Sequence, residues 1–258
     1  MEKIKSLIYS FIDLLSLGKG VKRNISGFNI YFPARWSRYF ESNYEDENIA
    51  FLKEHVKAGH MVFDIGAHLG LMSVISSQLS GPEGKVYAFE PSPSTFDLLK
   101  KVLALNSGYS PVVPEQMAIS NTIGNIRFYL SSDLGSNSNS LVEKHPLNRS
   151  AVEIKCTTLD AYAEKNHLTA IALIKIDAEG SELQVLQGAE KVLRTQRPKV
   201  ILAIHPRLIR NNNNQPRDIF SFLTSLNYTV QYKKKELDES AFCSIEDFFD
   251  VHLLPKTA

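Results

Sequence analysis

The sequence contains no apolar run of about 18 residues, the length that a membrane-spanning helix needs, so it predicts no such helix. It also lacks an excess of either charge: 29 Lys and Arg residues stand against 28 Asp and Glu residues, leaving a net charge of +1. This balance favours neither nucleic acid nor an acidic polymer as a partner. Cysteine is scarce, and Cys156 and Cys243 have no metal-ligand spacing. We expect two unpaired thiols in a reducing, cytoplasmic compartment.

The first 23 residues lack the pattern of a signal peptide, because Lys5, Ser6 and Asp13 interrupt the apolar residues and no small-x-small cleavage site follows. The apolar residues fall at helical spacing instead. They are Ile4, Leu7, Ile8, Phe11, Leu14 and Leu15. We expect an amphipathic helix docked on its own domain. The alternative is a peripheral membrane contact through residues 1–23, whose basic side chains suit anionic headgroups.

From about residue 46 onward, short apolar runs alternate with helical patterns, which predicts an α/β fold with a doubly wound sheet and helices on both faces. We therefore divide the chain into an N-terminal extension, residues 1–45 (the helix and a connecting segment), and a catalytic domain, residues 46–258. The expected strands are 60–67, 85–91, 111–120 (broken early by Pro114), 125–130, 152–159, 170–177 and 198–206.

Polar composition predicts loops at 131–150 and 210–217. Between the last two expected strands, Ser181 and Gln184 have the spacing of a capping box at a helix N-terminus.

A glycine-rich turn, "DIGAHLG", follows the first of these strands and contains Asp64, Gly66, Ala67 and Gly70. Gly66 permits close approach of a ligand, and Gly70 permits close packing of the next helix. Ligands of open α/β sheets bind at the carboxyl ends of strands, where this turn lies. The turn therefore predicts a cofactor site.

The identity of the cofactor follows from two acids. Glu90 ends the next strand, 20 positions after Gly70, and can accept both hydroxyls of a ribose. The turn lacks the G-x-G-x-x-G pattern that accommodates a pyrophosphate. Asp64, just before the turn, repels pyrophosphate but suits the ammonium and sulfonium of S-adenosylmethionine. The charges favour the methyl donor.

Four blocks in order carry a family resemblance: "VFDIGAHLG", "VYAFEPSPSTFDLLKKVLALN", "MAIS" and "IALIKIDAEGSELQVLQGAEKVL". Together they resemble the FkbM family of S-adenosylmethionine-dependent methyltransferases over roughly residues 45–206. The K-I-D-x-E-G-x-E block is the most specific. His68 occupies a position where many members have Asn, which we interpret as a tolerated variation.

The resemblance implies a Rossmann-like, seven-stranded class I methyltransferase sheet with its last strand inserted antiparallel. It implies that Gly66, Ala67, His68 and Gly70 lie by the cofactor, with Glu90 on its ribose. Two further positions, Met117 and Ala118, would flank the adenine. Family members often methylate sugar hydroxyls, so the expected reaction is O-methylation of a small-molecule or glycan acceptor.

A second group of residues converges on the same edge of the predicted sheet. Asp177 and Glu179 follow one strand, and His205 follows its neighbour. A sugar hydroxyl needs a positioned base, and these three groups are the candidates. Lys175 shares the face of Asp177 by strand alternation and needs a buried partner, which Asp177 can supply. Two acids and a histidine can also bind a divalent metal, although their spacing matches no recognised metal motif.

Three alternatives remain at this stage: an NAD(P)-type Rossmann oxidoreductase, a non-catalytic methyltransferase-like binding module, and a membrane-surface adaptor that acts through the N-terminal helix. The missing G-x-G-x-x-G argues against the first, and the retained acids argue against the second. The residues fix neither the acceptor nor the oligomeric state.

Overall fold

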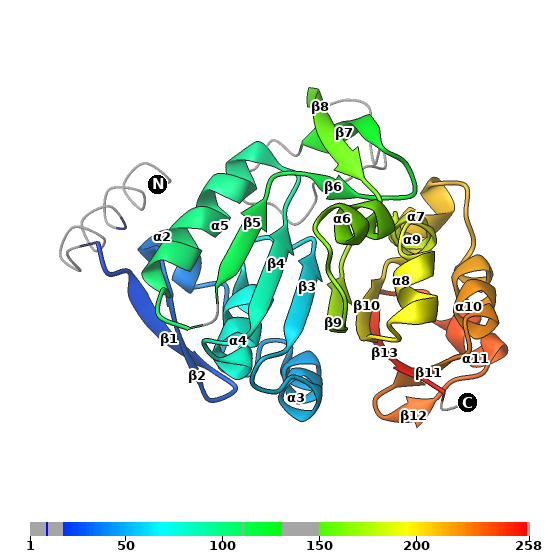
Figure 1. The fold of residues 1–258 in the computed structure, drawn as a ribbon, viewed down its shortest axis with the longest axis horizontal. Coiled ribbons are helices and arrows are strands. Elements are labelled where there is room, and N and C mark those ends of the chain that lie inside the picture. The colour runs from blue at the N-terminus through cyan, green and yellow to red at the C-terminus, as the bar shows by residue number, and fades with distance from the viewer. Residues whose placement is uncertain (1–8, 10–17, 110, 131–149, 257–258) are drawn as a thin grey trace.

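The computed structural model describes residue 9 and residues 18–109, 111–130 and 150–256. Its centre is an eight-stranded sheet with the order β12-β11-β13-β10-β9-β3-β4-β5 (Figure 1). The strands are β3 (Met61–Ile65), β4 (Lys85–Phe89), β5 (Val112–Glu115), β9 (Ile171–Ile176), β10 (Lys199–Ile204), β11 (Tyr228–Tyr232), β12 (Lys235–Glu236) and β13 (Phe249–Pro255).

The sheet has the expected doubly wound topology. Strands β10, β9, β3, β4 and β5 are parallel, and β13 lies antiparallel between β10 and β11. Seven of the strands therefore form the sheet that the family resemblance implies, although β11 and β13 are not among the strands expected from the sequence. The eighth, β12, is a two-residue addition at the edge beyond β11.

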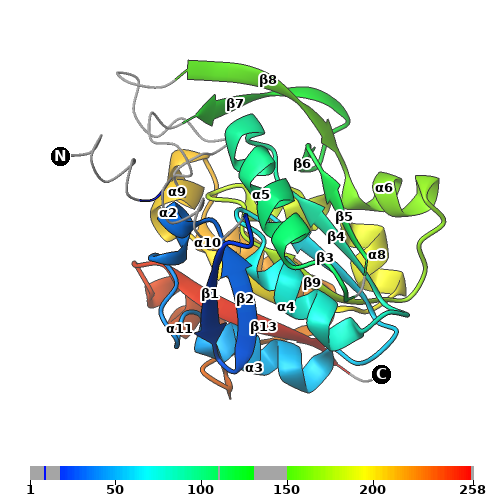
Figure 2. The same cartoon turned by 90° about the vertical axis from the view of Figure 1, so that its left-hand side faces the viewer.

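Successive strand residues face opposite layers of helices, as the side-chain alternation of a strand requires. Val62 packs with one layer and Phe63 with the other. The first layer contains α3 (Asp46–His55) and α4 (Leu71–Ser80), with α5 (Pro93–Leu105) beside them (Figure 2). The second contains α6 (Leu159–Lys165), α7 (Glu182–Gln187), α8 (Glu190–Thr195), α10 (Pro216–Ser225) and α11 (Glu239–Ser244). Both faces are covered, so the strands have continuous apolar sequences.

The segment that precedes residue 46 differs from a simple connecting segment. It forms a hairpin of β1 (Val21–Ile25) and β2 (Phe28–Phe32), followed by the short helix α2 (Ala34–Ser37). Five of its apolar side chains are buried in the same core as α3 and α4: Ile25, Ile30, Phe32, Trp36 and Phe40. This part of the extension is thus packed against the domain. The expected helix at residues 4–15 lies outside the described residues, apart from Tyr9.

A smaller sheet, β6-β8-β7, projects beyond the central sheet at the top of Figure 1. It contains β6 (Ala118–Ile119), β7 (Gly124–Leu130) and β8 (Ser150–Thr157). The expected extended pair is confirmed as β7 and β8. The single strand expected at 111–120 is wrong: it divides into β5 and β6, which belong to different sheets. Pro114 does not break β5, because β5 is an edge strand where a missing N–H is tolerated.

Two further expectations need correction. The stretch 210–217 is not a loop throughout: α9 (Pro206–Asn211) occupies its start, and α10 begins at Pro216. Ser181 and Gln184 do not form a capping box, because the Ser181 hydroxyl is buried and makes no hydrogen bond within the described part of the chain. The polar stretch 131–149 lies outside the described residues.

None of the helices that the structure describes is long and apolar enough to cross a membrane. Cys156 is buried and Cys243 partly buried, and both are free thiols, as expected.

Candidate active site

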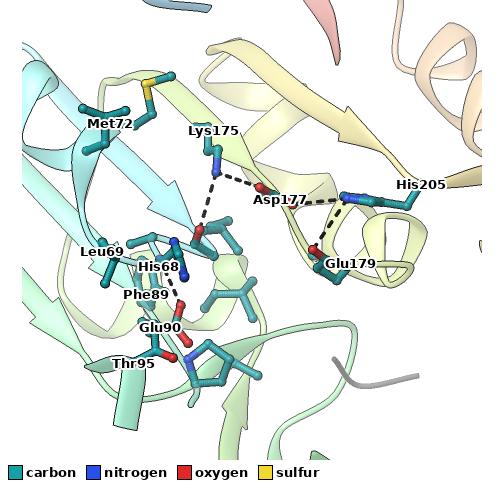
Figure 3. Close-up of a pocket in the computed structure, with 18 of the residues that line it drawn as sticks. His68, Leu69, Met72, Phe89, Glu90, Thr95, Lys175, Asp177, Glu179 and His205 are labelled. Atoms are coloured by element: carbon teal, nitrogen blue, oxygen red, sulfur yellow. Dashed lines mark hydrogen bonds and ion pairs between the residues drawn. The ribbon is translucent and has the colours of Figure 1, made fainter. Parts of the chain in front are cut away.

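A pocket of about 450 Å³ lies where β3, β4, β9 and β10 end (Figure 3). It brings together ten of the twelve residues that the sequence analysis singles out. They are Gly66, Ala67, His68, Glu90, Met117, Ala118, Lys175, Asp177, Glu179 and His205. Asp64 and Gly70 do not line it.

The turn after β3 requires glycine at position 66. Gly66 has φ 77°, and a Cβ there would lie 2.0 Å from the carbonyl oxygen of Asp177. The backbone N–H groups of Gly66 and Ala67 both donate to the carbonyl of Phe89, at 2.9 Å. The turn therefore packs closely against the ends of both β9 and β4. Gly70 acts differently: its own Cβ would lie 2.5 Å from Leu99, so it lets α4 and α5 approach.

Glu90 is 6% exposed and is oriented by backbone donors. Its Oε2 accepts from the His68 N–H at 2.9 Å, and its Oε1 accepts from the Ser92 N–H at 2.9 Å. Burial raises the pKa of Glu90 to about 7, although these two hydrogen bonds favour the charged form. Each oxygen keeps a further lone pair, so the carboxylate can still accept two hydroxyls.

Asp64 does not touch the pocket, contrary to the expectation of a direct cofactor contact. It is 1% exposed, and its Oδ2 accepts from the Ser73 hydroxyl at 2.6 Å. Burial raises its pKa, and the charge of Lys175 acts in the opposite direction. Asp64 therefore stabilises the turn from the side away from the pocket, because α4 covers the end of β3.

Lys175 connects the turn to the second group of residues. Its Nζ lies 3.3 Å from Asp177 Oδ2 and 3.4 Å from the Gly66 carbonyl, and the residue is 8% exposed. Burial alone would lower its pKa, but Asp177, Asp64 and Glu45 hold the pKa above the ordinary range of lysine. The predicted Lys175–Asp177 pair is thus confirmed, and the lysine is charged.

The opposite side of the pocket contains Asp177, Glu179 and His205 (Figure 3). His205 Nε2 lies 3.8 Å from Asp177 Oδ1 and 3.8 Å from Glu179 Oε1. Burial alone would raise the pKa of Asp177, but Lys175 and His205 outweigh it and hold that pKa below its usual range. β9 pairs with both β3 and β10, which is why these residues converge.

Glu182 is the main residue near this group that sequence reasoning did not assign to the site. It is 0% exposed, and its Oε1 lies 2.8 Å from His205 Nδ1. The same oxygen accepts from the Gly180 N–H at 3.0 Å. Burial alone would lower the pKa of His205, but Glu182 raises it above the ordinary histidine value. The E-G-x-E spacing of residues 179–182 was the sequence signal that could have placed Glu182 near the site.

Several lining residues, among them four aromatic or acidic ones, come from segments that sequence reasoning did not assign to the site. Phe40, Tyr44 and Glu45 precede α3, and Phe248 precedes β13. Phe248 is 57% exposed, and its ring centroid lies 5.0 Å from that of His205. The density of aromatic residues in 36–44 was the only sequence signal for the first group.

The pocket fits an adenosine-containing methyl donor. Glu90 offers a carboxylate to a diol, Met117 and Ala118 supply an apolar wall, and Gly66 leaves no side chain above the end of β9. The fold and these groups together define a class I methyltransferase of the Rossmann-like type.

The comparisons with known proteins identify the family. Residues 64–230 match the family model described as the methyltransferase FkbM domain. The chain therefore belongs to the FkbM methyltransferase family, whose members depend on S-adenosylmethionine. This membership favours the methyltransferase over the dinucleotide oxidoreductase.

Individual relatives agree with this assignment. The hexuronic acid methyltransferase AglP of Haloferax volcanii is 28% identical over 76% of this chain and 74% of its own. The 31-O-demethyl-FK506 methyltransferase FkbM of Streptomyces tacrolimicus is 25% identical over 58% and 67%. The solved structure of methyltransferase FkbM from Methylobacillus flagellatus KT aligns with a TM-score of 0.50 at 15% identity, covering 80% of this chain and 50% of that one. This last similarity concerns the fold.

Proposed function

We propose that the protein is an O-methyltransferase that acts on a sugar hydroxyl of a glycan, glycolipid or natural product. The observation that carries the proposal is one pocket with two chemically different sides: Glu90 and the glycine turn on one, and Asp177, Glu179 and His205 on the other. The name of AglP, a hexuronic acid methyltransferase, supports a sugar acceptor, and the name of FkbM supports transfer to oxygen.

In this proposal, different residues of the chain bind the methyl donor and orient the acceptor. Glu90 holds the ribose, and Met117 and Ala118 contact the adenine. When bound, S-adenosylmethionine supplies a methyl group on a positively charged sulfur. Transfer of this methyl group to the acceptor oxygen would leave the carbon–sulfur bonding pair on the sulfur. Asp177 orients the acceptor hydroxyl and receives its proton, a contribution of about 10²–10⁴-fold for a well-placed base.

Phe248 suits a carbohydrate acceptor in this proposal. Its exposed ring, next to His205 at the pocket edge, offers an apolar face to the C–H groups of a sugar. The acids beside it accept hydrogen bonds from hydroxyls, which are the groups a sugar presents.

The test is incubation of the full chain with labelled methyl donor and extracts of glycans and glycolipids, followed by mass spectrometry of the labelled product. We expect label in a sugar O-methyl ether. Calorimetry provides the second measurement: binding of S-adenosylmethionine and its demethylated product is expected. Tight binding of a nicotinamide dinucleotide without binding of the methyl donor would overturn the proposal, as would label found on nitrogen or carbon.

A further inference from the structure

Asp177, Glu179 and His205 each present one possible ligand atom to the same point of the pocket. These three atoms lie within 4.8 Å of one another. Two atoms that bind one transition-metal ion at about 2.0–2.2 Å can be at most about 4.4 Å apart. The two separations of 3.8 Å, from His205 Nε2 to each acid, are within that span.

The other nitrogen of His205 is fixed by a buried acid. A carboxylate can only accept, so with Glu182 ionised the proton of the 2.8 Å hydrogen bond between them lies on His205 Nδ1. Nε2 then faces the two pocket acids. A buried carboxylate that holds the distal N–H of an imidazole is the arrangement that orients metal-binding histidines. Glu182 is itself fixed by the Gly180 N–H.

The Asp177 carboxylate is satisfied on one side only. Its Oδ2 pairs with Lys175, whereas its Oδ1 is buried and has no hydrogen-bond partner among the described residues. That unpartnered oxygen is the atom 3.8 Å from His205 Nε2. A buried polar atom without a partner is costly, and a ligand that supplies positive charge at this point removes the cost.

The backbone at Glu179 indicates that its placement is built into the turn. Glu179 has φ 48° and Gly180 has φ 101°, and a Cβ at Gly180 would lie 2.7 Å from Leu208 Cβ. A left-handed conformation at a non-glycine residue costs free energy and is kept where the surroundings enforce it. Here Asn212, which donates to the Gly180 carbonyl at 3.1 Å, holds the turn that places Glu179 in the pocket.

We propose that Asp177, Glu179 and His205 form a binding site for a divalent cation, with Glu182 as the positioning residue for His205. Two carboxylate oxygens and one imidazole nitrogen suit Mn²⁺, which accepts both kinds of ligand. Three protein ligands leave coordination positions that face the pocket. If the proposed function holds, hydroxyl oxygens of the acceptor occupy these positions, and the cation orients them toward the methyl donor.

The test is titration of the full chain with Mn²⁺ after removal of metal by chelation, with free Mn²⁺ measured by electron paramagnetic resonance. We expect one saturable site per chain. Glu182→Gln should weaken Mn²⁺ binding by about 10–100-fold, the usual effect of removing such a partner. Glu179→Gln, which removes a ligand at a partly exposed position, should weaken it at least as much. Asp247→Asn is the matched control, because this carboxylate is 89% exposed and pairs with Arg207.

Binding of the demethylated cofactor, measured on the same samples, reports folding independently of Mn²⁺. Absence of saturable Mn²⁺ binding up to about 1 mM, the range of weak protein sites, in protein that binds the cofactor overturns the metal site and leaves the proposed function standing. Equal Mn²⁺ binding by the parent and Glu179→Gln also overturns it. Mn²⁺ binding at this site together with no methyl transfer to any sugar overturns the proposed function alone.

Discussion

The two sides of the pocket are built in different ways. On the cofactor side, the orientation of Glu90 comes from backbone N–H groups, those of His68 and Ser92. On the acceptor side, Asp177 and His205 follow different strands, and each depends on another charged side chain: Lys175 for Asp177 and Glu182 for His205. One side rests on turn geometry and the other on a network of charged side chains.

This difference determines how each side responds to substitution. Backbone donors remain when a side chain is changed, so the loss on the cofactor side should be confined to the altered contact. A network of buried charges responds as a unit, because removal of one member leaves the others uncompensated in a low-dielectric environment. We therefore expect larger effects on the acceptor side.

The largest effect should come from Lys175→Met, which removes the charge that faces both sides. Asp64 would be left buried without a neighbouring cation, and the partly buried Asp177 would lose its ion pair, at a cost of about 3–5 kcal/mol in the free energy of unfolding. For a chain of this length, the midpoint of thermal unfolding should fall by at least about 6 °C. Lys191→Met is the control, because Lys191 also pairs with an acid, Glu164, at 3.1 Å but is exposed. Equal unfolding temperatures for the two variants would contradict the network.

Asp177→Asn should separate catalysis from cofactor binding. The substitution keeps the shape of the side chain and removes the base, so the rate of methyl transfer should fall by about 10²-fold or more. Affinity for the demethylated cofactor should change little. The ratio of rate loss to affinity loss is the quantity to measure. A folded Asp177→Asn variant with the parent's rate would show that this acid is structural.

The same contrast explains what the sequence predicts and what it does not. The turn at Gly66 and the acid at Glu90 belong to one strand–helix–strand unit, so local spacing is enough to place them. The convergence of Asp177 and His205 follows from adjacent parallel strands. The contact of Glu182 with His205 depends on how α7 sits against β10, and helix packing has no short sequence signal. The same holds for Phe40 and Tyr44, which come from a segment taken as an extension.

Glu90→Ala tests the cofactor side and should have a smaller effect. Loss of the charge-assisted hydrogen bonds to the ribose should weaken cofactor binding by about tenfold, which corresponds to ~1.4 kcal/mol. The rate at saturating methyl donor should stay close to that of the parent. Calorimetry with the demethylated cofactor gives the affinity. A rate loss as large as that of Asp177→Asn would mean that the two sides are not separable.

The pH dependence of adenosine binding should be the smallest effect and the sharpest test of Glu90. Adenosine carries the ribose hydroxyls but no group that titrates near neutrality. The pKa of Glu90 is about 7 because the carboxyl is buried, and the ionised form is the one that accepts hydroxyl donors. Affinity should therefore fall by about threefold between pH 7.5 and pH 6.5 as the carboxylate is protonated.

The contribution of Glu90 to the stability of the ligand-free protein should change with pH in the direction opposite to the affinity for adenosine. A carboxyl whose pKa is raised from 4.5 to about 7 on folding binds more protons in the folded state than in the unfolded state. Its contribution to stability is full below pH 4.5 and is lost as the pH rises through about 7.

In Glu90→Gln, the pH dependence of adenosine affinity should disappear, because no proton is exchanged at this position. If the threefold change in adenosine affinity persists in Glu90→Gln, another group such as His205 is the one that titrates. The cofactor side would then not be independent of the charged side chains on the acceptor side.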